Sequence, residues 1–195
     1  MAENKLFPIF LKLEHLHVLI VGGGTIGLEK LTAILTNSPD ATITLAARNI
    51  KPEIFDFQSR FNKLTIQKKT FEVSDLDGKD LVIAATGDNY ISKLISEEAG
   101  KRKLLVNIAD TPDLCDFYLG SIVQKGDLKI AISTNGKSPT FAKKLKEVFN
   151  ETLSDDTQLS IDNLNKLRKH LKGDFTDRVK KMNEITSVLL SNSDH

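Results

Sequence analysis

A glycine-rich turn at residues 22–27 is the first place where residue types and spacing predict chemistry. Gly22, Gly24 and Gly27 form a G-x-G-x-x-G pattern directly after the apolar run at residues 17–21. In such a turn the first glycine permits a tight bend, the second lets backbone approach a pyrophosphate, and the third lets the next helix pack closely. The free N–H groups that begin this helix favour phosphates. We interpret the turn as a dinucleotide-binding loop, in preference to a merely tight strand-to-helix connection.

The residues after the second apolar run leave the type of dinucleotide open. An acidic residue about 20 positions beyond the glycine loop usually holds the ribose hydroxyls of NAD. Here the run at residues 41–46 is followed by Ala47, Arg48 and Asn49, with no carboxylate. Asn49 is a neutral hydrogen-bonding substitute, whereas Arg48 would tolerate a 2′-phosphate. On these residues alone, NAD and NADP are both open.

A carboxylate, Asp110, follows the fifth apolar run at residues 103–109. Ligands of open α/β sheets bind outside the carboxyl ends of the strands, so Asp110 would lie near a bound nicotinamide ring. There it could take or give a proton. The alternative is that Asp110, Thr111 and Pro112 only begin a turn, for which Asp and Pro are common. Position alone does not decide between these two interpretations.

The elements that must position these residues follow an alternating pattern over the first 110 positions. Five runs rich in apolar and β-branched residues are expected as strands: residues 17–21, 41–46, 64–67, 80–85 and 103–109. Helical patterns lie between them at about residues 25–37, 51–61 and 89–100. Several of the runs are continuously apolar, as in parallel strands covered on both faces. The order predicts an α/β fold with a doubly wound parallel sheet and right-handed crossovers.

The pattern changes after Asp110. Residues 117–124 and 128–133 are expected to form two strands of a hairpin joined by residues 125–127. Ser138 and Pro139 have the preferences of a helix N-cap and first helical position, so a helix is expected to about residue 150. Two more helical patterns cover residues 156–171 and 175–190. Helices of this size bury little surface alone, so we expect them to pack on each other and on a partner chain.

Composition excludes several classes of protein. The 195 residues contain 27 Lys and Arg against 26 Asp and Glu, a net charge of +1. Non-specific nucleic-acid binding needs a large positive excess, so we expect no nucleic-acid partner. The single cysteine, Cys115, excludes an intramolecular disulfide. No run of about 18 apolar residues exists and the first residues lack a signal-peptide core, so we expect a cytoplasmic protein without membrane contact.

Three segments together resemble the precorrin-2 dehydrogenase family, which includes the N-terminal half of siroheme synthase. They are Pro8-Ile-Phe leading into Val18–Gly24, the V-N-x-x-D…D-F block ending at Phe117, and the I-S-T-x-G-x-S-P block at residues 132–139. The last two blocks are far more specific than the glycine loop. The resemblance covers about residues 6–150 in order.

The resemblance implies a Rossmann-type sheet followed by a dimerisation region and a small helical domain. The corresponding boundaries are residues 1–113, 114–150 and 151–195. Family members oxidise precorrin-2 to sirohydrochlorin with NAD, and some also insert Fe²⁺ to give siroheme, in a site shared across a homodimer. The alternative from another class is a non-catalytic NAD-sensing module that regulates a partner and does not need Asp110.

The resemblance also assigns roles to residues of this chain. The catalytic carboxylate falls on Asp110, which would also be the metal ligand if iron is inserted; no other metal site is expected. Cofactor binding falls on the glycine loop and the end of the second strand: Gly22, Gly24, Thr25, Ile26, Gly27, Arg48 and Asn49. Because relatives lack the acidic residue too, the resemblance favours NAD. Thr134 stands where some relatives carry a phosphorylatable serine, and Gly120 where a proline is common.

The substrate of this family carries many carboxylates, so its site needs local cations despite the near-neutral net charge. Candidates near the predicted hairpin and the Ser138 helix start are Lys125, Lys129 and Lys137, and a helix N-terminus also favours anions. The alternative for each lysine singly is an ordinary surface residue. Asn107, within the V-N-x-x-D block, completes the expected substrate-binding set with Lys125, Lys137 and Ser138.

Overall fold

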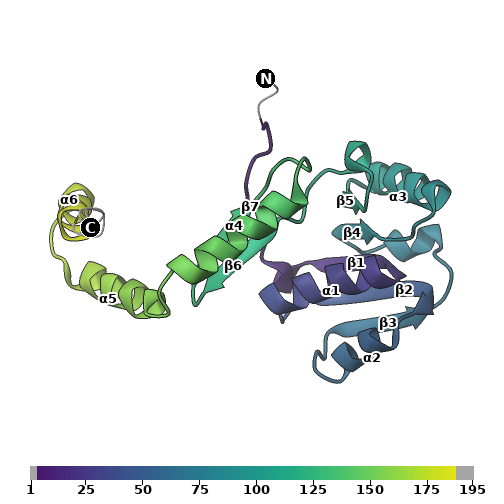
Figure 1. Ribbon diagram of the computed structural model, residues 1–195, viewed down its shortest axis with the longest axis horizontal. Coiled ribbons are helices and arrows are strands. Elements are labelled where there is room, and N and C mark those ends of the chain that lie inside the picture. Colours follow the sequence, from purple (N-terminus) through teal and green to yellow (C-terminus); the bar gives the residue numbers. More distant parts are fainter. Residues whose placement is uncertain (1–3, 188–195) are drawn as a thin grey trace. The chain divides into compact units, whose positions relative to one another are not determined.

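A computed structural model describes residues 4–187, which divide into two compact units between Leu119 and Gly120. The helices and strands of both units are labelled in Figure 1. The end of the helical pattern predicted to reach residue 190 lies outside the described residues. None of the described helices combines the length and the apolar content needed to cross a bilayer.

The first unit is built on a five-stranded parallel sheet with the order β3-β2-β1-β4-β5. Its strands are β1 (His17–Gly23), β2 (Thr42–Ile50), β3 (Leu64–Lys68), β4 (Leu81–Ala84) and β5 (Leu105–Ile108). Its helices are α1 (Thr25–Asn37), α2 (Pro52–Gln58) and α3 (Asn89–Arg102), with short 3-10 turns η1 (Leu13–His15), η2 (Val73–Leu76) and η3 (Pro112–Leu114). Because the order turns back at β1, the predicted doubly wound fold is confirmed.

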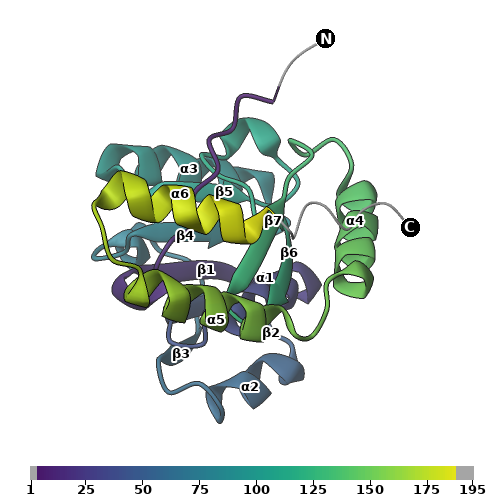
Figure 2. The same cartoon turned by 90° about the vertical axis from the view of Figure 1, so that its left-hand side faces the viewer.

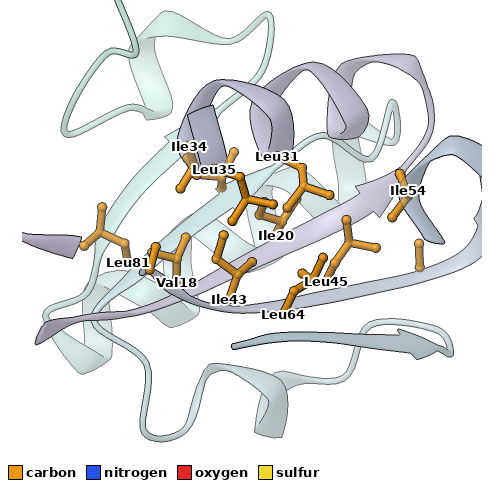
Figure 3. Close-up of a cluster of buried hydrophobic side chains, with 13 residues drawn as sticks. Val18, Ile20, Leu31, Ile34, Leu35, Ile43, Leu45, Ile54, Leu64 and Leu81 are labelled. Carbon is orange, nitrogen blue, oxygen red and sulfur yellow. The ribbon is translucent and has the colours of Figure 1, made fainter. Parts of the chain in front are cut away.

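Alternate side chains of β1 face two separate apolar clusters. Val18 and Ile20 belong to the cluster that α1 and α2 cover, where Leu31 of α1 is fully buried. Figure 3 shows the α1 side chains lying over these strands. Leu19 and Val21 belong to the cluster formed with α3 and the ends of β4 and β5. The continuous apolar runs of the sequence are therefore explained by burial on both faces.

The second strand is longer than predicted. β2 continues to Ile50, so Arg48 and Asn49 lie within the strand near its end and do not follow it. The reason is a shift of register after Val21, which pairs Gly23 with Ile50. The following helix is shorter than predicted, because α2 ends at Gln58.

The second unit begins with a β-hairpin and a helix. Strands β6 (Ser121–Lys125) and β7 (Leu128–Ile132) pair antiparallel, with Gly126 at a φ of +58° in the two-residue loop. Such a loop needs a left-handed φ at its first residue, which favours glycine. The first strand was predicted to begin at Phe117; that side chain instead packs against the core of the first unit.

Helix α4 (Pro139–Thr152) covers the hairpin, where Val123 and Ala142 are buried. The predicted Ser138 cap is confirmed, because its hydroxyl accepts the N–H of Phe141 at 3.3 Å. The chain continues through α5 (Thr157–His170) and α6 (Phe175–Thr186), which are labelled in Figure 2.

Candidate active site

The glycine loop joins β1 to α1 by close backbone approach. Gly22 has a φ of +120°, and a Cβ there would collide with the carbonyl group of Ala85 at the end of β4. A Cβ on Gly27 would collide with the carbonyl oxygen of Gly22. These two positions therefore exclude side chains for reasons internal to the fold, the tight turn and the close helix–strand packing expected of the motif.

Gly24 differs from these two glycines because it faces open space. No atom lies within 4 Å of a Cβ built on it, and its φ of −80° needs no glycine. The N–H groups of Thr25, Ile26 and Gly27 at the start of α1 donate to no residue within 4–187, and no side chain caps the helix. Free N–H groups beside open space fit the pyrophosphate of a dinucleotide.

Gly23 also shapes this loop, although the motif gives it no role. A Cβ on Gly23 would lie 2.7 Å from the carbonyl oxygen of Asn49, and the N–H of Lys51 donates to the carbonyl oxygen of Gly23 at 2.9 Å. The end of β2 is thereby held against the loop. Arg48 and Asn49, both exposed, are brought to the same edge of the sheet as Gly24.

The loop after β4 adds a polar cluster that the sequence analysis missed. The Thr86 hydroxyl accepts the N–H of Asp88 at 3.1 Å and lies 3.1 Å from the hydroxyl of buried Ser92. The Asp88 carboxylate accepts two backbone N–H groups in the first turn of α3, at 2.9 and 3.1 Å. These residues could have been predicted by the same reasoning as Asp110, because they are polar and follow a buried parallel strand.

Asp110 lies in the turn that directly follows β5, with its backbone in the left-handed region. The N–H of Thr111 donates to the carbonyl oxygen of Ile108 at 3.4 Å, and Asp110, the third residue of this turn, has a φ of +62°. Glycine is favoured in that conformation, and asparagine and aspartate are the other residues that tolerate it best. The Asp110 side chain is exposed and makes no hydrogen bond or ion pair with residues 4–187. The turn that Asp and Pro predicted is therefore present, and it presents a free carboxylate.

Residues 115–117 run along the outer edge of β5, directly after the Asp110 turn, and are hydrogen-bonded to this strand. The N–H of Asp116 donates to the Val106 carbonyl oxygen at 2.8 Å, and its carboxylate accepts the Val106 N–H at 3.0 Å. The Asn107 amide donates to the Phe117 carbonyl oxygen at 2.8 Å. Asn107, predicted as a substrate contact, is 6% exposed, and through this hydrogen bond it helps to position the segment after Asp110.

Cys115 links the same segment to Ile108 and Thr111, the two ends of the Asp110 turn. Its sulfur accepts the Ile108 N–H at 3.2 Å, and its thiol lies 3.2 Å from the Ile108 carbonyl oxygen and 3.4 Å from that of Thr111. Burial raises the pKa of the Cys115 thiol, which keeps it protonated and able to donate. Cys115 is a structural thiol beside the site rather than a nucleophile.

A cavity of about 320 Å³ lies between the first turns of α3 and the segment after Asp110. It is lined by Asn89, Ser92, Lys93, Thr111 and Leu114. Lys93 was absent from the predicted site because a lysine inside a helical pattern carries no sequence signal. Its place here depends on the α3–β5 packing.

The predicted substrate contacts after residue 120 belong to the second unit. The Lys125 ammonium lies 2.6 Å from the Asp155 carboxylate, and this ion pair lowers the pKa of Asp155. The Ser138 hydroxyl caps α4, and its N–H donates to the Thr134 hydroxyl at 3.0 Å. Of these predicted contacts, Lys137 has an exposed side chain without a partner in the described chain.

Comparison with known proteins tests the nucleotide interpretation. Residues 9–121 match a protein family described as "Putative NAD(P)-binding". The chain belongs to this NAD(P)-binding family. Residues 125–148 of the same chain match a second family, described as "Sirohaem biosynthesis protein central".

Several relatives are siroheme synthases. That of Methylococcus capsulatus is 37% identical over 139 residues, which are 71% of this chain and 29% of that protein. Siroheme synthase 1 of Cronobacter sakazakii is 35% identical over 146 residues, 75% of this chain and 30% of that protein. The siroheme synthase of Ruthia magnifica subsp. Calyptogena magnifica is 32% identical over 173 residues, 89% of this chain and 34% of that protein. This NAD(P)-binding protein thus spans about a third of the length of the curated relatives it matches.

A solved structure named SirC, precorrin-2 dehydrogenase, is similar over nearly the whole length. The TM-score is 0.73 at 26% identity, covering 92% of this chain and 89% of that one. The resemblance predicted from the motifs and the Rossmann-type fold are both confirmed. The predicted dinucleotide cofactor is confirmed for the domain that contains residues 22–27, and the role of these individual residues stays a prediction.

Proposed function

We propose that this chain is an NAD-dependent dehydrogenase that oxidises precorrin-2 to sirohydrochlorin in siroheme biosynthesis. The observation that carries the proposal is the exposed carboxylate of Asp110, which has no partner within residues 4–187 and lies at the same sheet edge as the glycine loop. The similarity to a precorrin-2 dehydrogenase over 92% of the chain supports the choice of substrate.

The reaction removes a hydride and a proton from the macrocycle. When bound, NAD supplies the acceptor for the hydride and becomes NADH. Asp110 is the proposed base that takes the proton, because its carboxylate is exposed and carries no competing hydrogen bond within residues 4–187. Cys115 positions this carboxylate by bonding to Ile108 and Thr111 at the two ends of its turn, while Asn107 and Asp116 bind the following segment to β5.

Gly24 and the N–H groups of Thr25, Ile26 and Gly27 are the proposed pyrophosphate site, with Gly22 setting the turn. Asn49 is proposed to bind the ribose hydroxyls, and exposed Arg48 lies beside it on β2. We infer NAD rather than NADP as the physiological cofactor, and rates with the two cofactors side by side test this choice.

We propose a homodimer in the cytoplasm, with residues 114–150 as its dimerisation region and residues 151–195 as the helical domain. Exposed apolar side chains of α4, α5 and α6, such as Phe141, Leu159 and Phe175, support a second copy as the surface that covers them. The proposed substrate contacts Lys125, Lys137 and Ser138 would contribute to a site shared within that dimer.

The experiment mixes the protein with precorrin-2 and NAD without oxygen and follows NADH. Asp110→Ala is expected to lower turnover by about 10²- to 10⁴-fold, the usual contribution of a general base, while NAD affinity stays unchanged. Asp113→Asn is the matched control, since Asp113 is an exposed carboxylate three residues on. Full activity of Asp110→Ala would remove Asp110 from the mechanism.

The same assay separates this proposal from the NAD-sensing alternative. A regulatory module would bind NAD and form no NADH from precorrin-2, and Asp110→Ala would change nothing. Well-folded wild-type protein that forms no NADH would overturn the enzyme proposal.

Insertion of Fe²⁺ into sirohydrochlorin is a second candidate activity, favoured by the same free carboxylate. Within residues 4–187 no three His, Cys, Asp or Glu side chains gather as a metal site, so Asp110 would act as the protein ligand for an iron substrate. Iron-dependent consumption of sirohydrochlorin above the spontaneous rate, lost in Asp110→Ala, is the expected result.

A further inference from the structure

The cavity beside Asp110 contains polar groups that the fold leaves unused. Asn89 and Lys93 line it from the first turns of α3, and Thr111 and Leu114 line it from the segment after β5. The side chains of Asn89, Lys93 and Thr111 make no hydrogen bond or ion pair with any residue from 4 to 187. Thr111 directly follows Asp110, so the cavity opens next to the proposed base.

Lys93 differs from the other cations of its helix. Lys101 and Arg102, at the far end of α3, both form ion pairs with Glu98, at 2.5 and 2.8 Å. Near the Lys93 end, the Asp88 carboxylate is occupied by two backbone N–H groups of the first turn. Lys93 forms no ion pair with any residue from 4 to 187, and exposed Glu97, four residues on along α3, is the nearest acidic position on its own helix.

The position of this cation along the sheet separates it from the cofactor loop. The glycine loop follows β1, whereas the cavity lies at β5, two strands away and on the side opposite β2. Neighbouring strands are about 4.8 Å apart, so the cavity is roughly 10 Å from the β1 end. Arg48 and Asn49, the proposed adenosine side, lie on β2. The cavity thus lies on the opposite side of the glycine loop from the proposed adenosine contacts.

We propose that Lys93 binds a carboxylate of the anionic substrate and thereby holds the macrocycle beside Asp110. This inference rests on the proposed function, because it names the recognition of the same polycarboxylate substrate. An ammonium group forms charge-assisted hydrogen bonds with carboxylates, and the Asn89 amide and Thr111 hydroxyl supply further donors. Leu114 gives the cavity an apolar wall for a pyrrole ring. Lys93 is a binding residue, and proton removal stays with Asp110.

The test compares Lys93→Gln, Lys93→Arg and the matched control Lys101→Gln on the same helix. Lys93→Gln is expected to raise KM for precorrin-2 about tenfold, as for loss of one charge-assisted hydrogen bond, with KM for NAD and the Tm unchanged. Lys93→Arg should restore most of the affinity, since a cation is retained. Lys101→Gln should behave as wild type. An unchanged KM for precorrin-2 in Lys93→Gln, or a rise confined to KM for NAD, would overturn the proposal.

A binding titration keeps the outcome separate from the proposed reaction. Sirohydrochlorin, the expected product, carries the same carboxylates, and its fluorescence reports binding to the full-length protein without turnover. Lys93→Gln should weaken this binding about tenfold at low salt, and raising the salt concentration should reduce the difference. Absence of NADH formation by wild-type protein would contradict the proposed function; equal sirohydrochlorin affinity of wild type and Lys93→Gln would contradict the role of Lys93.

Discussion

The interactions that stabilise the first unit internally differ in kind from those within the second unit. The unit up to Leu119 contains all of the largest fully buried side chains, among them Leu19, Ile20 and Leu31. In the described part of the second unit, buried apolar side chains are limited to Val123 and Ala142, while seven large apolar side chains on α4, α5 and α6 stay exposed.

The contact between α5 and the hairpin of the second unit is polar. The Lys125–Asp155 ion pair joins β6 to the segment before α5, at 2.6 Å. The N–H of Asp127 donates to the Gln158 amide oxygen at 2.7 Å, and the Gln158 amide donates back to the Asp127 carboxylate at 3.0 Å. The nucleotide unit therefore has its own apolar core, whereas the described part of the second unit leaves most of its large apolar side chains exposed.

The largest expected effect distinguishes the buried apolar side chains of the first unit from the exposed apolar side chains of the second. Ile20→Ala removes a fully buried side chain at the centre of the sheet and should lower the free energy of unfolding by about 2–5 kcal/mol. Phe141→Ala, at a side chain that is 57% exposed, should change it by less than about 0.5 kcal/mol while lowering the dimer fraction. Urea denaturation followed by circular dichroism measures the first effect, and sedimentation velocity measures the second. Equal losses of unfolding free energy would break the comparison.

A pair of glycines tests whether the tight packing of the nucleotide unit serves the fold or the ligand. Gly27→Ala forces a Cβ into the Gly22 carbonyl group and should lower the free energy of unfolding by about 1–3 kcal/mol. Gly24→Ala meets no atom within 4 Å, so the Tm should be unchanged. NAD affinity should nevertheless fall at least about tenfold, because the new Cβ stands where the pyrophosphate approaches. Calorimetric titration with NAD and thermal melts of both variants distinguish the two roles.

Loss of a polar contact should loosen the second unit without affecting the first. Gln158→Ala removes both hydrogen bonds to Asp127, so amides of α5 should exchange with an opening free energy lower by about 1–2 kcal/mol. Amides of β1 should keep their protection. Asn165→Ala is the control, since Asn165 is exposed on the same helix. Hydrogen exchange followed by mass spectrometry reports both units together, and faster exchange in β1 would contradict the separation.

The smallest expected effect is on the pH dependence of stability, and it involves the first unit alone. Burial, with the nearby charge of Lys79, lowers the pKa of His17 from 6.5, against an opposing effect of Asp80. The folded protein therefore holds His17 neutral, and its contribution to stability is present above pH 6.5 and lost as the pH falls through the lowered pKa.

His17→Gln should accordingly flatten the fall in Tm between about pH 8 and pH 5. His15→Gln, at a largely exposed side chain, should leave the pH dependence as in wild type. Thermal melts across this range test the difference, and an unchanged slope in His17→Gln would show that other groups dominate.

Much of the nucleotide unit could be predicted because its signals are local. Continuous apolar runs indicated the strands and their carboxyl ends, and the spacing of Gly22, Gly24 and Gly27 indicated the loop. Interpretations that depended on pairing were less accurate. Arg48 and Asn49 became part of β2 through a register shift, and Asn107 became a buried positioning residue through its bond to the Phe117 carbonyl group.

The amino-acid sequence by itself determined the parallel sheet, the dinucleotide loop and the candidate carboxylate Asp110, because periodicity and glycine spacing act over a few residues. Which polar groups have a partner within residues 4–187 could be read from the tertiary structure alone. No local sequence pattern distinguishes Lys93 from Lys125. In the structure, Lys93 lines a cavity, whereas Lys125 forms an ion pair with Asp155. The physical reason is that the partner of a charge is chosen by packing between segments distant in sequence, which no local pattern records.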